Sequence, residues 1–155
     1  MGTVRRAIEK RQLEQEPWLA WNEFVDLIAT TPYHELDVLQ RVAQLAFLYD
    51  AEVQNGSHRQ YFENRRDELL EETQLALKTL DAACQAAILE EAAGKWRQRP
   101  RDPIKTVEGY VQTALEGEFD TLDQAYYKCR PSIHELLETY LADNFNRFIQ
   151  VRNDV

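Results

Sequence analysis

Residues 36 to 64 constrain the fold more than any other stretch, because an apolar helical face runs there directly into a polar segment. Apolar residues recur at spacings of three and four, the period of one helical face, and others widen that face to nearly the full circumference. The face comprises Leu36, Leu39, Val42, Ala46, Tyr49 and Val53, widened by Leu45, Phe47 and Leu48. A helix that is apolar all round is a buried one. The sequence therefore predicts a buried central helix over residues 34 to 55.

The predicted central helix ends in hydrogen-bonding side chains. Gly56 follows them, and we expect it to turn left-handed at no steric cost. Ser57 and Gln60 have the spacing of a capping box, which predicts a second helix from residue 57. The polar cluster, as we call this group, comprises Tyr49, Glu52, Asn55, Gly56, Gln60, Tyr61 and Asn64. We favour a structural role for it, in which these groups satisfy the unpaired backbone groups of two abutting helix ends.

The rest of the chain also has helical periodicity, without a useful period-two apolar run. Its 155 residues are 44% hydrophobic and 29% charged, with five glycines and five prolines, which suits one helical globule. We predict an all-α fold, a single compact domain over residues 1 to 155 with about seven to nine helices around the central one. Residues 1 to 16 are expected to form a weak amphipathic helix that frays, and residues 97 to 105 a basic surface loop.

Two cysteines, Cys84 and Cys129, lie in separate helical patterns without a CxxC pair. This spacing matches neither a zinc knuckle nor a redox motif, so we expect both to be reduced and buried. The uncharged runs are far shorter than the roughly 20 residues of a membrane helix, and the N-terminus has no apolar signal region. The sequence therefore predicts a cytoplasmic protein with no membrane contact.

No catalytic residue, metal ligand or cofactor is predicted. The sequence has no Ser-His-Asp context, nucleophile elbow or glycine-rich phosphate loop. We interpret His34, His58 and His134 as isolated in their local patterns, which does not fit a helical metal site. The imidazole of His58 is expected to be half-buried rather than catalytic. The sequence therefore favours a protein that is not an enzyme.

The run from residue 49 to residue 64 resembles the signature of the DNA-mimic-protein-like family, whose members are small, acidic and all-helical. The residues that carry the resemblance are Tyr49, Glu52, Val53, Gln54, Asn55, Gly56, Gln60, Tyr61, Phe62 and Asn64. The family motif reads approximately Glu-Val-Asn-Asn-Gly-Gly-Phe-x-Gln-Tyr/Phe-Phe/Tyr-x-Asn, and this chain departs from it at Gln54, Ser57 and His58. The resemblance implies a helical fold and, for the best-described type, imitation of DNA towards a DNA-binding protein. It brings no catalytic residue.

The net charge of −9 disfavours direct binding to nucleic acid or to an anionic membrane, and it favours a basic partner. Acids three or four residues apart on a helix stand about 5 to 6 Å apart, close to the charge spacing along one DNA strand. The acidic set of candidate partner-binding residues comprises Glu63, Asp67, Glu68, Glu71, Glu72, Glu90, Glu91, Glu116, Glu118, Asp120 and Asp123. We therefore predict a non-enzymatic interaction protein that binds the DNA-binding face of a transcription regulator or another nucleic-acid-binding protein.

Two alternatives remain open at this stage. A polar cleft at the junction of the helices over 34 to 55 and 57 to 66 could bind a small ligand or serve an uncharacterised enzymatic function. Alternatively, exposed Tyr126 and Tyr127 could dock a second copy of the chain and form a homodimer.

Overall fold

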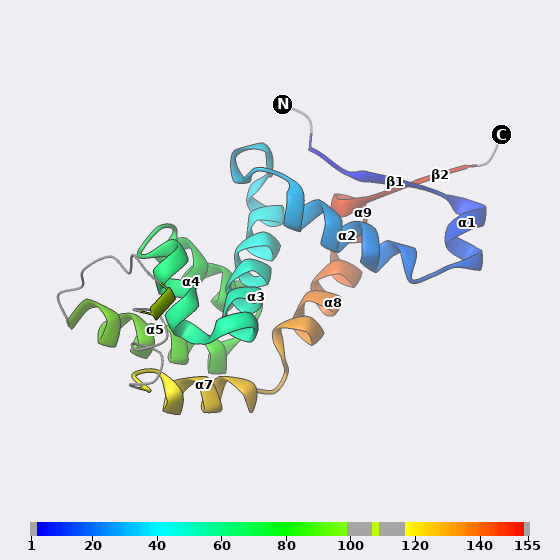
Figure 1. The fold of residues 1–155 in the computed structure, drawn as a ribbon. Helices are drawn as coiled ribbons and strands as arrows, with labels where there is room; N and C mark the ends of the chain where they lie inside the picture. The colour runs from blue at the N-terminus through cyan, green and yellow to red at the C-terminus, as the bar shows by residue number, and fades with distance from the viewer. Residues whose placement is uncertain (1–2, 99–106, 109–116, 154–155) are drawn as a thin grey trace.

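The computed structural model describes residues 3–98, 107–108 and 117–153, and most of them are helical. The central element is α3 (Val38–Arg65), which contacts α2, α4, α7 and α8 (Figure 1). This arrangement confirms the predicted all-α class and the single compact domain around a buried helix. The other elements are β1 (Arg6–Glu9), α1 (Lys10–Gln15), α2 (Leu19–Thr30), the 3-10 turn η1 (Tyr33–Glu35), α4 (Leu70–Thr79), α5 (Ala83–Gln98), α7 (Asp120–Tyr127), α8 (Ile133–Asp143), α9 (Phe145–Phe148) and β2 (Ile149–Arg152).

Helix α3 begins at Val38 instead of residue 34, because Asp37 caps it. Asp37 Oδ1 accepts the backbone N–H of Gln40 at 2.8 Å, and Gln40 Oε1 accepts the backbone N–H of Asp37 at 3.2 Å. This reciprocal pair is a capping box. The Gln40 amide is buried and also donates to the carbonyl oxygens of Val4 and Arg147. The start of α3 is thereby tied to both ends of the chain.

The Asp37→Ala variant is expected to have a free energy of unfolding about 1 to 2 kcal/mol lower than the wild type at pH 7, because the helix loses its cap. Burial alone would raise the pKa of Asp37, but the Gln40 N–H and the Arg147 guanidinium 2.9 Å away outweigh it and lower the pKa. The stabilisation is therefore present above the ordinary Asp pKa of about 3.9 and is lost as the pH falls through the lower folded value. Urea denaturation should show the full difference at pH 7 and a smaller one at about pH 3, below the ordinary Asp pKa; an equal difference at both values contradicts this origin.

Helix α3 is kinked at residues 56 and 57, where two helices were predicted. Gly56 has φ −159° and Ser57 has φ 72°, so the left-handed residue is Ser57, and the prediction for Gly56 was wrong. The glycine is needed for space instead, since a Cβ there would lie 2.1 Å from Gln60 Oε1 and 2.9 Å from Gln60 Cβ. Ser57 Oγ accepts the backbone N–H of Arg59, whereas the Gln60 side chain turns back towards Glu52. The predicted capping box between Ser57 and Gln60 therefore does not form.

The N-terminal segment departs from the predicted helix over residues 1 to 16. Strand β1 pairs in parallel with β2, with Arg6 opposite Ile149, and the helix is limited to α1. Ile8 and Ile149 are both buried in this two-stranded ladder. The partner strand lies at the other end of the chain, so local periodicity cannot reveal the pairing.

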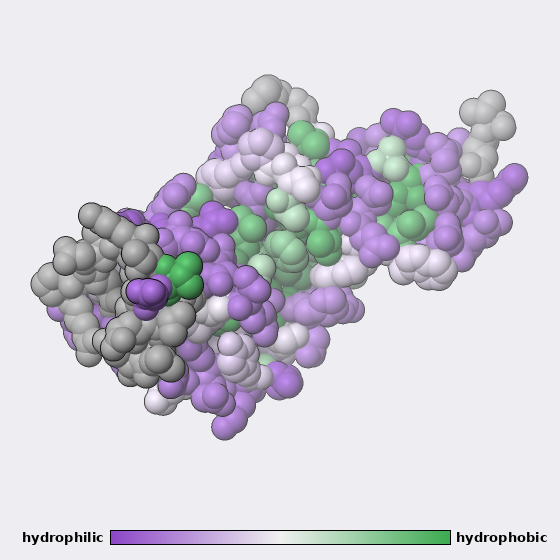
Figure 2. Space-filling view, viewed as in Figure 1, coloured by the Kyte–Doolittle hydropathy of each residue, from purple (hydrophilic) through white to green (hydrophobic). Residues whose placement is uncertain are grey.

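The predicted basic loop is described only in part. Of the predicted basic loop over 97 to 105, Arg97 and Gln98 belong to the end of α5, and the remainder lies outside the described residues. Figure 2 shows apolar side chains gathered over the middle of one face, with a second apolar group towards the end where β1 and β2 lie. In the described ranges, no helix is both long and apolar enough to cross a membrane.

Candidate functional site

The polar cluster lies at the kink of α3, and its carboxylate and amide side chains bond mainly to one another. Glu52 Oε2 accepts from Gln60 Nε2 at 3.0 Å and from Asn64 Nδ2 at 2.8 Å. Asn55 Nδ2 donates to Gln60 Oε1 at 3.4 Å. Glu52 thus joins the helix before the kink to the helix after it. The contacts brace the kink, but all three join side chains, whereas the prediction had these groups satisfy backbone groups at the helix ends. They already engage the groups that a polar ligand would need.

The predicted ligand cleft at this junction receives no support from the cavities around it. A cavity of about 420 Å³ lies between α2 and α8, and one of about 240 Å³ lies between α3 and α4. Neither is lined by Glu52, Asn55 or Gln60. A third cavity is lined by Tyr49 and Tyr61, but its volume of about 10 Å³ is too small for a ligand. A ligand role for the polar cluster therefore remains a sequence-based alternative.

The Asn64→Ala variant is expected to lower the free energy of unfolding by about 0.5 to 1.5 kcal/mol, because one hydrogen bond to the Glu52 carboxylate is lost. Glu52→Ala should cost more, since both Gln60 and Asn64 lose their acceptor. Gln54→Ala, at an exposed position of the same helix, is the control and should stay within about 0.5 kcal/mol of the wild type. Thermal unfolding of the three variants tests this, and an unchanged midpoint for Glu52→Ala would rule out the bridging role.

Behind the polar cluster, His58 is fully buried and bonded at both ring nitrogens. Its Nδ1 lies 2.7 Å from Asp123 Oδ1, and its Nε2 lies 2.7 Å from the Tyr49 hydroxyl. Burial, reinforced by nearby negative charge, raises the pKa of Tyr49 well above its usual range, so the phenol keeps its proton beside Nε2. The Nδ1–H group then donates to Asp123, which also accepts the backbone N–H of His58 at 3.0 Å. The His58 side chain thereby joins α3 to α7.

The complete burial of His58 corrects the expectation of a half-buried ring. Its ring packs among the aromatic side chains of Tyr49, Phe119 and Tyr126, with centroid distances of 5.6 to 6.3 Å. The imidazole therefore lies in a largely aromatic environment, in which both ring nitrogens have hydrogen-bond partners. This geometry positions helices and leaves no free base for catalysis at His58.

Tyr126 and Tyr127, predicted as an exposed pair, face different environments. Tyr126 is only 4% exposed, and its hydroxyl donates to Asp50 Oδ1 at 2.6 Å. Burial and the Asp50 charge raise its pKa, which keeps the phenol as a donor. Tyr127 is 41% exposed. The prediction of an exposed aromatic pair was therefore wrong for Tyr126, which forms a second link between α7 and α3.

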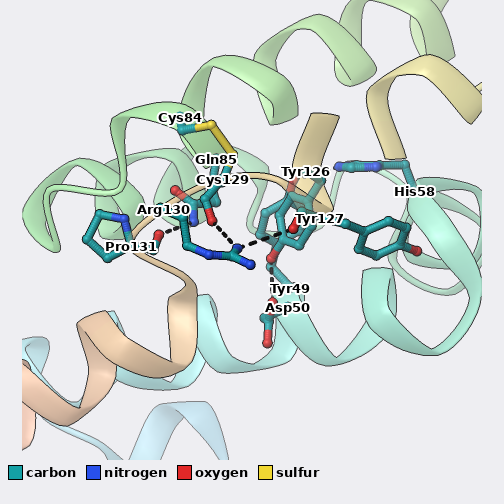
Figure 3. Close-up of a disulfide and its surroundings, with 10 residues drawn as sticks. All are labelled: Tyr49, Asp50, His58, Cys84, Gln85, Tyr126, Tyr127, Cys129, Arg130 and Pro131. Carbon is teal, nitrogen blue, oxygen red and sulfur yellow. Dashed lines mark hydrogen bonds between the residues drawn. A yellow bond between two sulfur atoms is a disulfide. The ribbon is translucent and has the colours of Figure 1, made fainter. Parts of the chain in front are cut away.

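A disulfide joins Cys84, at the start of α5, to Cys129, which follows α7 (Figure 3). The prediction of two reduced cysteines was wrong, because a pairing across 45 residues cannot be read from local spacing. Gln85 Nε2 also donates to the carbonyl oxygen of Pro131 at 2.8 Å beside the bridge. Helix α7 is thus held to α3 by Asp123 and Tyr126 and to α5 by Cys129. Disulfides persist mainly in oxidising compartments, so this bond gives no support to the predicted cytoplasmic location.

The acidic set divides into surface and interior residues. Glu63 is half-buried, and the exposed members are Asp67, Glu68, Glu71, Glu72, Glu90, Glu91 and Asp120. Asp123 is buried against His58, and Glu118 forms a buried ion pair with Arg59, so the prediction placed both wrongly on the surface. Glu116 lies outside the described residues. Buried carboxylates need a partner, and no local sequence pattern identifies His58 and Arg59 as those partners.

Four exposed members lie close together in the chain, two in the connection from α3 to α4 and two in the first turn of α4, and we call them the acidic turn: Asp67, Glu68, Glu71 and Glu72. Within the described part of the chain, none of their carboxylates hydrogen-bonds or ion-pairs with another side chain. The connection is tight, because Arg66 and Leu69 both adopt left-handed backbone conformations. These unpaired charges are free to meet a partner.

His134 also corrects the sequence reading, in which all three histidines were isolated. Its Nε2 forms an ion-pair contact with Glu138, four residues further along α8. Spacing alone could have shown this pair, since positions i and i+4 are neighbours on a helix. Among the described residues, no three His, Cys, Asp or Glu side chains are grouped so that they could hold a metal ion.

These features define a compact helical protein in which Glu52, Gln60 and Asn64 brace the kink of α3, and in which the acidic turn carries surface carboxylates without side-chain partners among the described residues. The family model described as DMP19-like protein matches residues 34–144, and the chain belongs to this family. The match covers α3 through α8 and confirms the family that the sequence resembled. No curated protein and no solved structure shows significant similarity to the chain.

Proposed function

We propose that the protein imitates DNA and occupies the DNA-binding face of a basic protein, such as a transcription regulator. Membership of the DMP19-like family, a family of DNA mimic proteins, supports this role. The observation that carries it is the acidic turn, with four exposed and unpaired carboxylates within six residues. No enzymatic role is proposed.

The spacing of these carboxylates suits a surface that binds the lysine and arginine side chains with which a protein contacts DNA phosphates. Glu71 and Glu72 lie in the first turn of α4, and Asp67 and Glu68 lie in the turn that precedes it, so the four carboxylates are gathered within six residues of chain. DNA presents one charge per about 3.4 Å of axis along each strand, so lysines and arginines arranged for DNA meet a comparable charge density. Glu90 and Glu91 are also exposed, on α5, which packs against α4.

Carboxylates at an exposed site raise the rate of association with a basic partner more than they stabilise the complex once it has formed. Their attraction is screened beyond about 8 to 10 Å at physiological salt. Binding should therefore be fast and strongly weakened by added salt, in the manner of the partner's binding to DNA.

Affinity capture with matched variants tests the proposal. One variant neutralises the acidic turn through Asp67→Asn, Glu68→Gln, Glu71→Gln and Glu72→Gln. The control variant removes the same charge elsewhere through Glu9→Gln, Glu14→Gln, Glu23→Gln and Asp143→Asn. Proteins captured from a lysate are eluted with a salt step, with and without competing duplex DNA, and identified by mass spectrometry.

The wild type and the control are expected to retain basic DNA-binding proteins that duplex DNA displaces, and the neutralised acidic turn should lose them. Equal capture by the two variants would show that the acidic turn is not the binding surface. An eluate without DNA-binding proteins would contradict the mimic role itself.

A further inference from the structure

A groove lies between the first half of α3 and α4, beside the acidic turn. It encloses about 240 Å³. Its lining combines the apolar side chains of Val38, Val42 and Leu45 from α3 and of Leu75 from α4 with one acid, Glu72, and one base, Arg41. We call it the α3–α4 groove. Its volume suits one or two apolar side chains of a partner better than a whole drug-sized ligand, for which pockets of about 300 to 1,000 Å³ are usual.

Two large apolar side chains of the groove are exposed to solvent. Val38 is 77% exposed and Leu75 is 63% exposed, although the neighbouring Leu45 and Ala76 are buried. Covering an exposed leucine or valine is favourable, and apolar side chains gathered at a concave site mark interaction surfaces. The groove therefore offers apolar binding energy that the described fold does not use.

The charges at the groove determine which partner fits. Glu72 lines the groove, and it belongs to the acidic turn that continues with Glu71 and Glu68. Arg41, the lining base, is held against the chain, with Nε donating to the carbonyl oxygen of Tyr33 at 3.0 Å and its guanidinium 4.5 Å from the Tyr33 ring centre. An apolar floor with carboxylates at its edge is complementary to an apolar side chain flanked by lysines or arginines.

We propose that the α3–α4 groove accepts a leucine-class side chain from a basic amphipathic helix of the partner protein. This inference rests on the proposed function, because it gives the same partner a second, apolar contact. The acidic turn supplies attraction that salt weakens, and the groove supplies an anchor that salt leaves intact. An apolar anchor buried at the centre of a contact typically dominates its affinity.

Two fluorescent synthetic peptides serve as probes. The first is a helical peptide with lysines on one face and leucines at positions i, i+3 and i+4 on the other. The second has the same lysines with serines in place of the leucines. Binding is followed by fluorescence anisotropy at low and high salt for the wild type, for Leu75→Ser, for the neutralised acidic turn, and for Val151→Ser as an exposed apolar control in β2.

The leucine peptide is expected to bind the wild type and Val151→Ser equally, and Leu75→Ser about tenfold more weakly at either salt concentration. The neutralised acidic turn should bind it more weakly at low salt and lose most of the salt dependence. Because Leu75 is exposed, its replacement should leave thermal unfolding unchanged.

The other outcomes separate the two proposals. Equal, salt-sensitive binding of both peptides would overturn the groove inference and leave the acidic contact standing. Leucine-specific binding that ignores salt and the neutralised acids would support the groove and contradict the mimic role. Failure of the leucine peptide to bind would overturn the groove inference, as would a dimer that Leu75→Ser dissociates without changing peptide binding.

Discussion

Removal of the disulfide, through Cys84→Ser and Cys129→Ala, is expected to lower the free energy of unfolding by about 4 kcal/mol. The bridge spans 45 residues, and closing a loop of this length removes much conformational entropy from the unfolded chain. Alanine is chosen at Cys129 because that side chain is buried, whereas Cys84 is exposed. Urea denaturation of the variant and of the oxidised wild type measures the difference.

Reduction of the wild-type protein provides the control for this prediction. A thiol reductant should shift the wild-type unfolding midpoint towards that of the double variant and leave the double variant unchanged. A wild-type midpoint that ignores the reductant, with the thiols shown to be free, would contradict a stabilising role for the bridge.

The Asp123→Ala variant is expected to lose about 2 to 4 kcal/mol of unfolding free energy, because it leaves two buried donors of His58 without an acceptor. Those donors are the backbone N–H, 3.0 Å from Asp123 Oδ1, and the ring Nδ1–H, 2.7 Å from the same atom. Urea denaturation at neutral pH measures the loss.

Asp120→Ala and Asp123→Asn are the matched controls. Asp120 is an exposed acid at the start of the same helix, and its removal should cost at most about 1 kcal/mol through the helix dipole. Asp123→Asn keeps an acceptor oxygen and should lie between the two. In a His58→Phe background the cost of Asp123→Ala should shrink, because the ring donor is gone. Equal losses for Asp120→Ala and Asp123→Ala would refute the buried link.

The sequence was sufficient for the parts of the fold that depend on local periodicity. The apolar face from Leu39 to Val53 predicted the buried α3, and the absence of period-two runs predicted a helical protein. The short β1–β2 ladder could not be predicted from the sequence, because each strand has four residues and its partner lies at the other end of the chain. The Cys84–Cys129 disulfide was not predicted for the same reason, since contacts between residues distant in sequence leave no local pattern.

The candidate site was predicted in part. The polar cluster lies together at the kink of α3, as expected from its spacing, with Glu52 as the shared acceptor. The acidic turn is exposed, whereas Asp123 and Glu118 face inward. Charge alone does not distinguish a surface carboxylate from a buried one, because the distinction depends on a partner such as His58 that only the tertiary structure supplies.

The structure also explains how the acidic surface is supported. Helix α4 packs against both α3 and α5, and α5 is tied through the disulfide to the chain just after α7. Helix α7 is in turn held to the kink of α3 through Asp123 and Tyr126. The acidic turn therefore connects two packed helices, which limits the freedom that binding would have to remove.

Competition between the protein and DNA for one partner tests the central claim most directly. A captured DNA-binding protein is bound to a fluorescent duplex, and the wild-type protein is added while the anisotropy of the DNA is followed. The mimic role predicts that the anisotropy falls to the value of free DNA, and that the neutralised acidic turn fails to lower it. Anisotropy that stays constant or rises would show that protein and DNA do not share a surface, and would contradict the proposal.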